Sequence, residues 1–309
     1  MQRQRIVSLL PSATEIVWGL GFANGLVGRS HECDHPPGAA RLPVCSRTRI
    51  DAGAASVDIQ DQATKTLTEV LSVHDVDLDI LQRLQPTHII TRDQCKACSV
   101  DLAWAQEAAR GLLPGEPDII SLAPQSLEDI FDDIYRVGHA LGAIFQAEDF
   151  VAHLVRRKNF VMARGHEQMH RPTVACLEWF DPLMVAGNWM PQLVRCAGGI
   201  NLLGEGSDPS RSMAWEELAA ADPEILLLQP RGFDLKRTLR EAGSLTRHPL
   251  WSGMRAVKEG KVFAVDGNQY FNRPGPRIVD SLEMLAEIIH PGEFSFGHED
   301  EHWCRLVSG

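Results

Sequence analysis

The sequence predicts an α/β protein made of two similar lobes with parallel sheets, and three observations support this fold class. Short apolar runs alternate with helical patterns along the 309 residues, as expected for parallel strands joined by helices. The two halves of the chain resemble each other at two places that occur in the same order. Between the halves the sequence becomes continuously helical, which predicts a long helix joining one lobe to the other.

The predicted strands and helices follow from these apolar patterns. Runs of strand length lie at residues 5–10, 25–30, 87–91, 118–122, 173–178, 224–229 and 261–265. Helical patterns lie between them, among others at 14–20, 100–110, 212–221 and 277–289. Ser12 and Thr14 are placed to cap the first helix. The polar sequence after Pro291 predicts a surface tail.

The internal repeat links segments that are far apart in the chain. "LGFANGLVGRS" at 20–30 resembles "AGGINLLGEGS" at 197–207, and "LQRLQPTHIIT" at 81–91 resembles "LAAADPEILLL" at 218–228. The first half is longer, because its loop "HECDHPPGAARLPVCSRTRID" lies within the repeated stretch. Long loops in compact domains are usually functional or disordered, and the density of His and Cys in this one favours function.

The helical stretch between the halves predicts the lobe boundaries. Ser126 begins a helix whose apolar face carries Ile130, Ile134, Val137 and Leu141, and Gly142 ends it. A second helix follows from about residue 147 to 164, without proline inside. We therefore predict an N-terminal lobe at 1–145, a bridging helix at 146–166 and a C-terminal lobe at 167–309.

Composition excludes several classes of partner. The chain has 44% hydrophobic and 23% charged residues, which is typical of a globular protein, and 30 basic against 41 acidic residues give a formal charge of −11. Nucleic acids and anionic membranes need a basic face, so neither is an expected partner. The first residues lack the apolar region of a secretory signal, and no apolar run reaches the ~18 residues of a membrane span. As written the chain predicts a cytoplasmic protein, or a periplasmic one if a signal has been removed.

Parallel sheets bind ligands beyond the carboxyl ends of their strands, and this rule selects the candidate site. The loops concerned are "LPSATE", "SHECDHP", "TRDQCKAC", "EWFDP", "QPRGFD" and "DGNQYFNRPGPR", together with "GNWMPQL", where Trp189 opens a helix. Their aromatic and polar residues favour a large, flat or amphipathic ligand in a cleft between the lobes. The predicted ligand-binding residues are Ser12, His31, Glu32, Gln94, Glu178, Trp179, Phe180, Trp189, Arg231, Phe233, Tyr270 and Arg273. The charged members of this set either bind polar groups of a ligand or pair with one another at the rim.

Three cysteines in these loops leave several interpretations open. Cys95 and Cys98 form a C-x-x-C pair between a strand and a helix, and Cys33 follows another strand. With His31 or His35 they have the composition of a zinc site, and three cysteines can also hold an iron–sulfur cluster. A redox dithiol at Cys95 and Cys98, and plain packing of small thiols, are the alternatives. Cys45 is a weaker fourth candidate.

Motifs of common enzyme classes are absent from the sequence. It contains no G-x-S-x-G, no H-E-x-x-H, no P-loop and no dinucleotide fingerprint with the right spacing. We therefore expect a binding protein and not an enzyme.

Four stretches resemble a known family. "VSLLPSATEIVWGLG", "LVGRSHECDHP", "EWFDPLMVAGNWMPQLVRCAGG" and "DPEILLLQPRGFDL" are similar to the helical-backbone, or class III, substrate-binding proteins, and most similar to the cobalamin-binding branch. The resemblance extends from about residue 5 to 290. It implies two Rossmann-like lobes bridged by one helix, with a corrinoid, haem or metal chelate delivered to an ABC importer.

Three hypotheses follow from the sequence. The first is a binding protein for a corrinoid or a related metal-containing cofactor, either of the ABC-importer type, with a permease as partner, or a cytoplasmic derivative. In it Trp179, Phe180 and Trp189 form apolar walls. The second is a cytoplasmic metal or iron–sulfur protein using Cys33, Cys95 and Cys98. The third is a dithiol redox enzyme.

Overall fold

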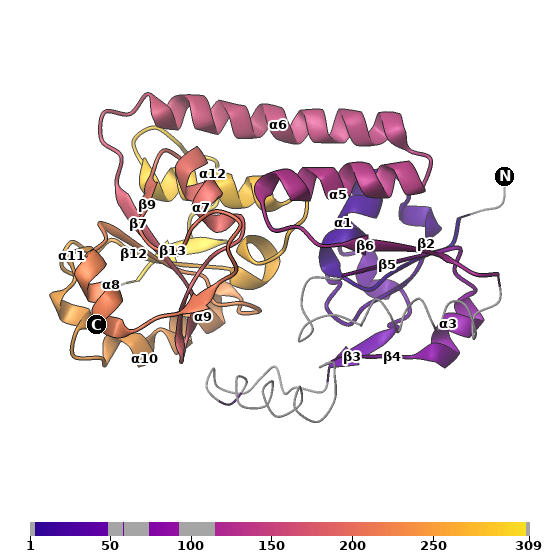
Figure 1. Ribbon diagram of the computed structural model, residues 1–309, viewed down its shortest axis with the longest axis horizontal. Helices are drawn as coiled ribbons and strands as arrows, with labels where there is room; N and C mark the ends of the chain where they lie inside the picture. The colour runs from indigo at the N-terminus through magenta and orange to yellow at the C-terminus, as the bar shows by residue number, and fades with distance from the viewer. Residues whose placement is uncertain (1–3, 49–57, 59–73, 93–114, 307–309) are drawn as a thin grey trace. The chain divides into compact units, whose positions relative to one another are not determined.

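The computed structural model describes residues 4–48, 58, 74–92 and 115–306, which form two compact units (Figure 1). The N-terminal unit comprises the described residues of Met1–Ala54, Asp58–Pro124 and Glu128–His153. The C-terminal unit consists chiefly of the described residues of Leu154–Gly309. Helix α6 (Ile144–His166) contributes residues to both units. The predicted lobe boundaries stay a prediction.

A four-stranded parallel sheet in the order β2-β1-β5-β6 forms the centre of the N-terminal unit. A short antiparallel pair, β3 with β4, lies outside it. The elements are β1 (Ile6–Ser8), α1 (Pro11–Gly19), η1 (Ala23–Gly25), β2 (Leu26–Arg29), η2 (Ala39–Arg41), β3 (Ser46–Thr48), β4 (His74–Val76), α3 (Leu78–Leu84), β5 (His88–Arg92), β6 (Asp118–Leu122) and α5 (Leu127–Ala140).

The sheet of the C-terminal unit has a parallel centre, β9-β7-β11-β12, extended by antiparallel strands β8, β10 and β13. Its strands are β7 (Thr173–Phe180), β8 (Leu183–Val185), β9 (Ile200–Asn201), β10 (Arg211–Ser212), β11 (Ile225–Leu228), β12 (Val262–Val265) and β13 (Trp303–Arg305). Its helices are α7 (Met190–Cys196), α8 (Trp215–Ala221), α9 (Leu235–Glu241), α10 (Gly243–Thr246), η3 (Trp251–Gly253), α11 (Arg255–Lys258), η4 (Gly267–Phe271) and α12 (Ile278–Ile289).

Helices cover both faces of this second sheet (Figure 1). On one face Ala175, Leu177, Leu226 and Leu228 are buried with residues of α8, α10 and α11. On the other face, Val174 lies next to side chains of α7 and α12. Burial on both faces explains why the central strands are continuous apolar runs. The prediction of an α/β fold with parallel sheets is confirmed.

Two local predictions are wrong. The sequence after Pro291 is not a surface tail: Trp303 is buried, and its strand β13 pairs antiparallel with β12. Ser12 and Thr14 do not cap the first helix, which begins at Pro11 with Leu10 as its N-cap. The Thr14 hydroxyl instead donates to Ser8 Oγ at 2.9 Å.

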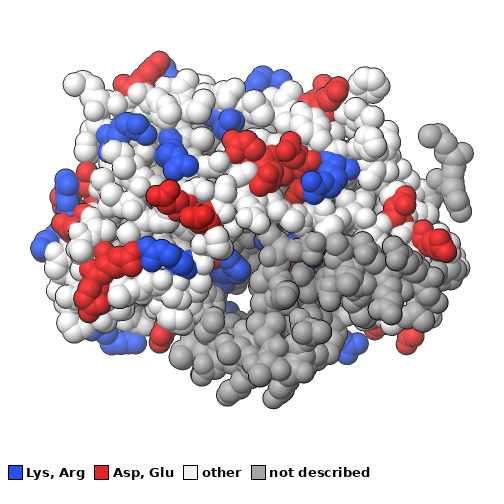
Figure 2. Space-filling model, in the orientation of Figure 1, with Lys and Arg blue, Asp and Glu red and all other residues white. Residues whose placement is uncertain are grey.

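The surface carries charges of both signs. On the face drawn in Figure 2, acidic and basic side chains of the described residues are interspersed. No described helix is both long enough and apolar enough to cross a bilayer.

Candidate functional site

The candidate site in the C-terminal unit begins where its central strands end. Strand register pairs Leu228 with Leu177 on one side and with Ala264 on the other, so β7, β11 and β12 end at the same edge of the sheet. The loops after these strands therefore lie next to one another. Their backbones are tied together, because the Arg231 amide donates to the carbonyl of Glu178 at 3.1 Å. The register thus brings together residues that lie up to about 90 positions apart in the chain.

A buried carboxylate forms the polar part of this edge. Glu178 is 4% exposed, and its Oε1 forms an ion pair with Nη2 of Arg231. Its other oxygen accepts from the Ser210 hydroxyl at 2.6 Å. The Arg231 side chain is half exposed, so its guanidinium reaches solvent beside the buried anion. Burial of a carboxylate is tolerable here because both of its oxygens have partners.

Aromatic rings pack beside the Glu178–Arg231 pair. The rings of Trp179 and Phe233 have centroids 5.4 Å apart, and the Arg237 guanidinium lies 3.8 Å above the Phe233 ring. Trp179 is 8% exposed and donates its indole N–H to the carbonyl of Asp181 at 2.9 Å. Trp189, the N-cap residue of α7, donates its indole N–H to the carbonyl of Phe271 at 2.9 Å. Both indoles are therefore held in fixed orientations by the backbone.

The loop after β12 is shaped by one aspartate. The Asp266 carboxylate accepts the amides of Asn268 at 2.9 Å and Gln269 at 2.7 Å, and so starts the single π-helical turn η4. Burial raises the pKa of Asp266 above its ordinary value. Gly267 is required in this turn, because a Cβ there would lie 2.3 Å from the carbonyl oxygen of Pro230. The turn therefore lies directly against the loop after β11.

Tyr270 and Arg273 come from the same loop. Tyr270 is buried, its hydroxyl lies 3.1 Å from Nε2 of His302, and Arg277 lies 4.9 Å above its ring. Burial raises the pKa of Tyr270, so its hydroxyl is a neutral phenol at physiological pH. Arg273 is 5% exposed, and its amide donates to the carbonyl of Tyr270 at 3.1 Å.

The loops after the strands of the N-terminal unit carry hydroxyl and thiol groups instead. His31 Nδ1 lies 2.9 Å from Ser46 Oγ, and Glu32 is exposed at the next position. Cys33 is fully buried, with its sulfur 3.2 Å from Ser30 Oγ and 3.8 Å from the carbonyl of Ser8. Ser12 is buried within α1.

The metal hypothesis finds no support in the described residues. Among residues 4–48, 58, 74–92 and 115–306, no three His, Cys, Asp or Glu side chains are grouped so that they could hold a metal ion. Cys95, Cys98 and Gln94 lie outside the described residues. Burial raises the pKa of Cys45 to about 11, so this thiol stays protonated at neutral pH.

The structure adds residues that the sequence-based prediction did not contain. Ser210, Asp266, Asn272 and His302 position predicted residues or their loops: Asn272, for example, donates from Nδ2 to the carbonyl of Gln229 at 2.9 Å. Asp266 had a detectable signal, because an aspartate directly after an apolar strand and before Gly-Asn is typical of a loop cap. Ser210 contacts Glu178 and His302 contacts Tyr270, in each case 32 positions away in the chain. No sequence pattern connects the members of either pair. The prediction that the ligand lies between the lobes stays a prediction.

Comparisons with known proteins identify relatives over nearly the whole chain. A family model described as periplasmic binding protein matches residues 6–268. The chain is 23% identical to a vitamin B12-binding protein of Vibrio vulnificus, over 92% of this chain and 89% of that protein. It is 22% identical to an uncharacterized ABC transporter substrate-binding lipoprotein of Bacillus subtilis, over 94% of this chain and 81% of that protein.

Solved structures show the same fold. A periplasmic haem-binding protein of Pseudomonas aeruginosa superposes with a TM-score of 0.72 at 19% identity, covering 99% of this chain and 98% of that one. The periplasmic vitamin B12 binding protein of Vibrio cholerae gives a TM-score of 0.66 at 18% identity, covering 93% and 96%. At these identities the likeness concerns the fold alone.

Proposed function

The chain belongs to the periplasmic binding protein family, and from this premise we propose that it binds a corrinoid, such as vitamin B12, and delivers it to an ABC importer. Relatives named as vitamin B12-binding proteins cover more than nine tenths of the chain and support this choice of ligand. The family consists of substrate-binding proteins, so the chain acts by binding and release.

The observation that carries the proposal is the meeting of three loops at one sheet edge of the C-terminal unit. A corrin ring has broad apolar faces and an edge of amide groups that donate and accept hydrogen bonds. Trp179, which is 8% exposed, supplies aromatic surface of the kind that packs on such a face, and the buried Phe233 ring supports it from behind. The Glu178–Arg231 pair supplies an anchored charge for the ring edge, and its guanidinium is half exposed.

Haem is the second candidate ligand, since structural neighbours include haem-binding proteins. Its iron takes His, Cys, Met or Tyr ligands in proteins, and Tyr270 lies in the loop after β12. Tyr270 is only 7% exposed, and its hydroxyl already lies 3.1 Å from Nε2 of His302, which opposes its use as an iron ligand. We therefore rank the corrinoid first.

The test is a pair of equilibrium titrations, one with cyanocobalamin and one with haemin, followed by calorimetry and by the visible spectrum. The expected result is saturable binding of cyanocobalamin. No binding of cyanocobalamin up to about 1 mM, which corresponds to only about −4 kcal/mol, overturns the corrinoid proposal. Haemin binding in that case supports the second candidate.

Glu178→Gln tests the role of the ion pair. The variant keeps the side-chain shape but removes the charge that orients Arg231, so we expect about tenfold weaker cyanocobalamin binding, or about 1.4 kcal/mol. Glu217→Gln is the matched control, because Glu217 also pairs with an arginine, Arg211, but on the surface of the same unit. Equal affinity of both variants and the unchanged protein contradicts a role for Glu178.

The proposal also says where in the cell the chain acts and that an ABC importer receives its ligand. Relatives named as periplasmic or as lipoproteins act outside the cytoplasm, and we propose the same location for this chain. Fractionation of the native cell with an antibody against the chain tests it. Recovery in the cytoplasmic fraction alone contradicts delivery to an importer and leaves the ligand proposal standing.

A further inference from the structure

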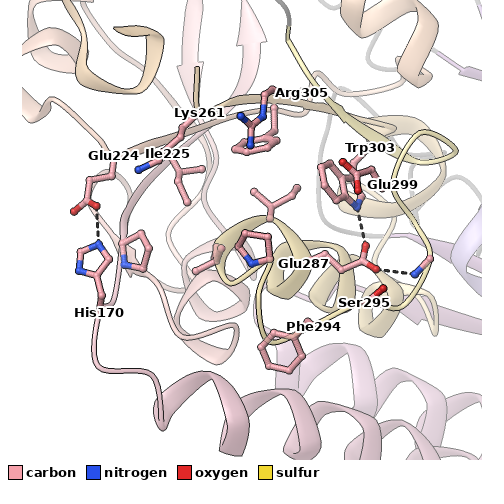
Figure 3. A pocket seen from close by; sticks show the side chains of 16 residues that line it. His170, Glu224, Ile225, Lys261, Glu287, Phe294, Ser295, Glu299, Trp303 and Arg305 are labelled. Atoms are coloured by element: carbon pink, nitrogen blue, oxygen red, sulfur yellow. Dashed lines mark hydrogen bonds and ion pairs between the residues drawn. The ribbon is translucent and has the colours of Figure 1, made fainter. Parts of the chain in front are cut away.

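A cavity lies in the C-terminal unit at the end of the central strands that is opposite the candidate functional site. It has a volume of about 500 Å³, and Ile225, the first residue of β11, and Lys261, just before β12, line it (Figure 3). The loops of the candidate functional site follow the last residues of these strands. A strand of this length spans about 13 Å, so the cavity is separate from that site.

One wall of the cavity is held rigidly by a single buried carboxylate. Oε1 of Glu287 accepts the amides of Phe296, Gly297 and His298, at 2.7 Å from Gly297 and 3.5 Å from His298. Its Oε2 accepts the indole N–H of Trp303 at 2.7 Å. The segment from Phe294 to Trp303 is thereby fixed, and the cavity exists before any ligand arrives (Figure 3).

The inner surface of the cavity is largely apolar. Ile225, Phe263, Ile289 and Phe294 line it, and all four are buried. They come from two strands, a helix and the fixed segment. A volume of about 300–1,000 Å³ with apolar walls and a few polar groups is usual for small-molecule sites.

Two of the three carboxylates that line the cavity already have partners. Glu287 is compensated by its four donors, and Glu224 is paired with His170 at 2.8 Å and with Arg255 at 3.5 Å. Arg305 contacts the ring of Phe263, 5.5 Å from its centroid, and has no carboxylate within 4.0 Å among the described residues.

Lys261 adds a second cation next to Ile225 (Figure 3). Its ammonium pairs with Glu259 at 2.7 Å, but this pair is partly exposed, and such pairs contribute about 0–1 kcal/mol. Glu299 also lines the cavity, near Trp303, and its negative charge opposes the binding of any anion, of a dianion more strongly than of a monoanion.

We propose that this cavity binds a small amphipathic monoanion, with its apolar body on Ile225, Phe263 and Phe294 and its carboxylate or sulfonate at Arg305 and Lys261. The site is independent of the ligand site at the carboxyl ends of the strands. An apolar acid of this type would bury its apolar surface in the cavity and form one charge-assisted hydrogen bond at the opening of the cavity.

The probe for the test is 1-anilinonaphthalene-8-sulfonate, a fluorescent aromatic monoanion, titrated into the full chain. We expect a saturable rise in fluorescence with one site per chain. Decanoate should displace the probe, whereas decyltrimethylammonium, which has the same chain and the opposite charge, should not. Equal displacement by both compounds overturns the proposal.

Arg305→Gln and Lys261→Met identify the site. Each should weaken probe binding about fivefold or more, whereas Lys258→Met, an exposed lysine on α11, should leave it unchanged. Ser295→Trp, at an exposed position on the cavity wall, should block the probe while the thermal midpoint stays the same. Unchanged binding in Arg305→Gln and Ser295→Trp overturns the proposal. Cyanocobalamin binding should be the same in all four variants, which separates this result from the proposed function.

Discussion

The two units are built on one topological plan and differ in what they attach to it. The order β2-β1-β5-β6 in the N-terminal unit matches the order β9-β7-β11-β12 in the C-terminal unit, strand for strand and all parallel. Helices α3 and α8 end alike, at Gln85 with φ 45° and Asp222 with φ 41°, each followed by proline and a strand. The internal repeat in the sequence thus corresponds to a repeat in structure.

The differences lie at the strand ends and at the sheet edges. Only the C-terminal unit, among the described residues, extends its parallel sheet with antiparallel strands. Its strand ends and the loops after them carry tryptophans and a paired carboxylate, whereas those of the N-terminal unit hold serines and a buried thiol. The shared plan therefore fixes where a site can form, and the loops decide its chemistry. Four experiments would break or sharpen this comparison.

The largest effect is expected from Glu287→Ala in α12, because this residue holds β13 and the segment before it in place. The change leaves three amides and the Trp303 indole without their acceptor, and each unsatisfied buried donor costs about 1–3 kcal/mol. We expect a loss of about 3 kcal/mol or more in the free energy of unfolding, measured with urea. Glu293→Ala, which removes a half-exposed pair with Arg164, should cost less than about 1 kcal/mol. Similar losses would mean that the extension does not stabilise the unit.

The N-terminal unit should show its own dependence on pH, through Asp133. Burial raises the pKa of Asp133 from 3.8 to about 7, although Arg136 donates to it at 3.0 Å. Because the folded pKa is the higher one, the stabilising contribution is complete below pH 3.8 and is lost as the pH rises through about 7. Between pH 3.8 and about 7 the free energy of unfolding should therefore fall by up to about 1.4 kcal/mol per pH unit.

Asp133→Asn should remove this slope and raise stability at pH 7.5, as followed by urea unfolding between pH 4.5 and 7.5. Asp132→Asn, at the exposed neighbouring position, should keep the slope. An unchanged slope in Asp133→Asn would show that another group titrates.

A paired serine exchange tests whether ligand affinity resides in the C-terminal unit, on the premise of the proposed function. Ser210→Ala removes one of the two partners of Glu178 and should weaken cyanocobalamin binding about fivefold, or about 1 kcal/mol. Ser46→Ala removes the equivalent support of His31 in the other unit and should change affinity less than about twofold. The reverse ranking, measured by calorimetry, would assign the affinity to the N-terminal unit.

The smallest effect concerns the two left-handed helix ends. Glycine adopts positive φ without strain, so Gln85→Gly should stabilise the chain by about 0.5 kcal/mol. Asp222→Gly gains the same relief but loses the bond from the Arg255 amide to Asp222 Oδ1 at 2.7 Å. It should therefore be neutral or slightly destabilising in thermal unfolding. Equal shifts in both variants would mean that this side-chain bond contributes nothing.

The sequence predicted the central parallel strands well, but it did not predict the antiparallel strands that extend the C-terminal sheet. Strand β7 was found because it is an apolar run buried on both faces, and β6 because it is a short apolar run in which buried residues alternate with more exposed ones. Ile130 and Ile134 revealed the inner face of α5 by their spacing. Strand β13 was missed because Trp303 is its only fully buried side chain, and charged residues surround it. Its place depends on Glu287, a contact that no local pattern encodes.

The same distinction applies to the candidate site. Glu178 and Arg231 were predicted from their positions at strand ends, and the two side chains pair with each other; their contact with a ligand stays a prediction. Ser210 could not be predicted, because its contact depends on how β10 returns beside β8. A position after a parallel strand is local information, whereas the partner across the edge depends on the complete fold.

The hydrogen bonds that Glu287 accepts from successive amides have a kinetic consequence. Three successive amides share one oxygen atom as their acceptor, so none of them can be exposed to solvent for long while the other two stay bound. After correction for their intrinsic exchange rates, these amides should therefore share one protection factor, set by a single opening equilibrium. Exchange at these amides would measure how large a fraction of the time the segment is lifted from the rest of the unit.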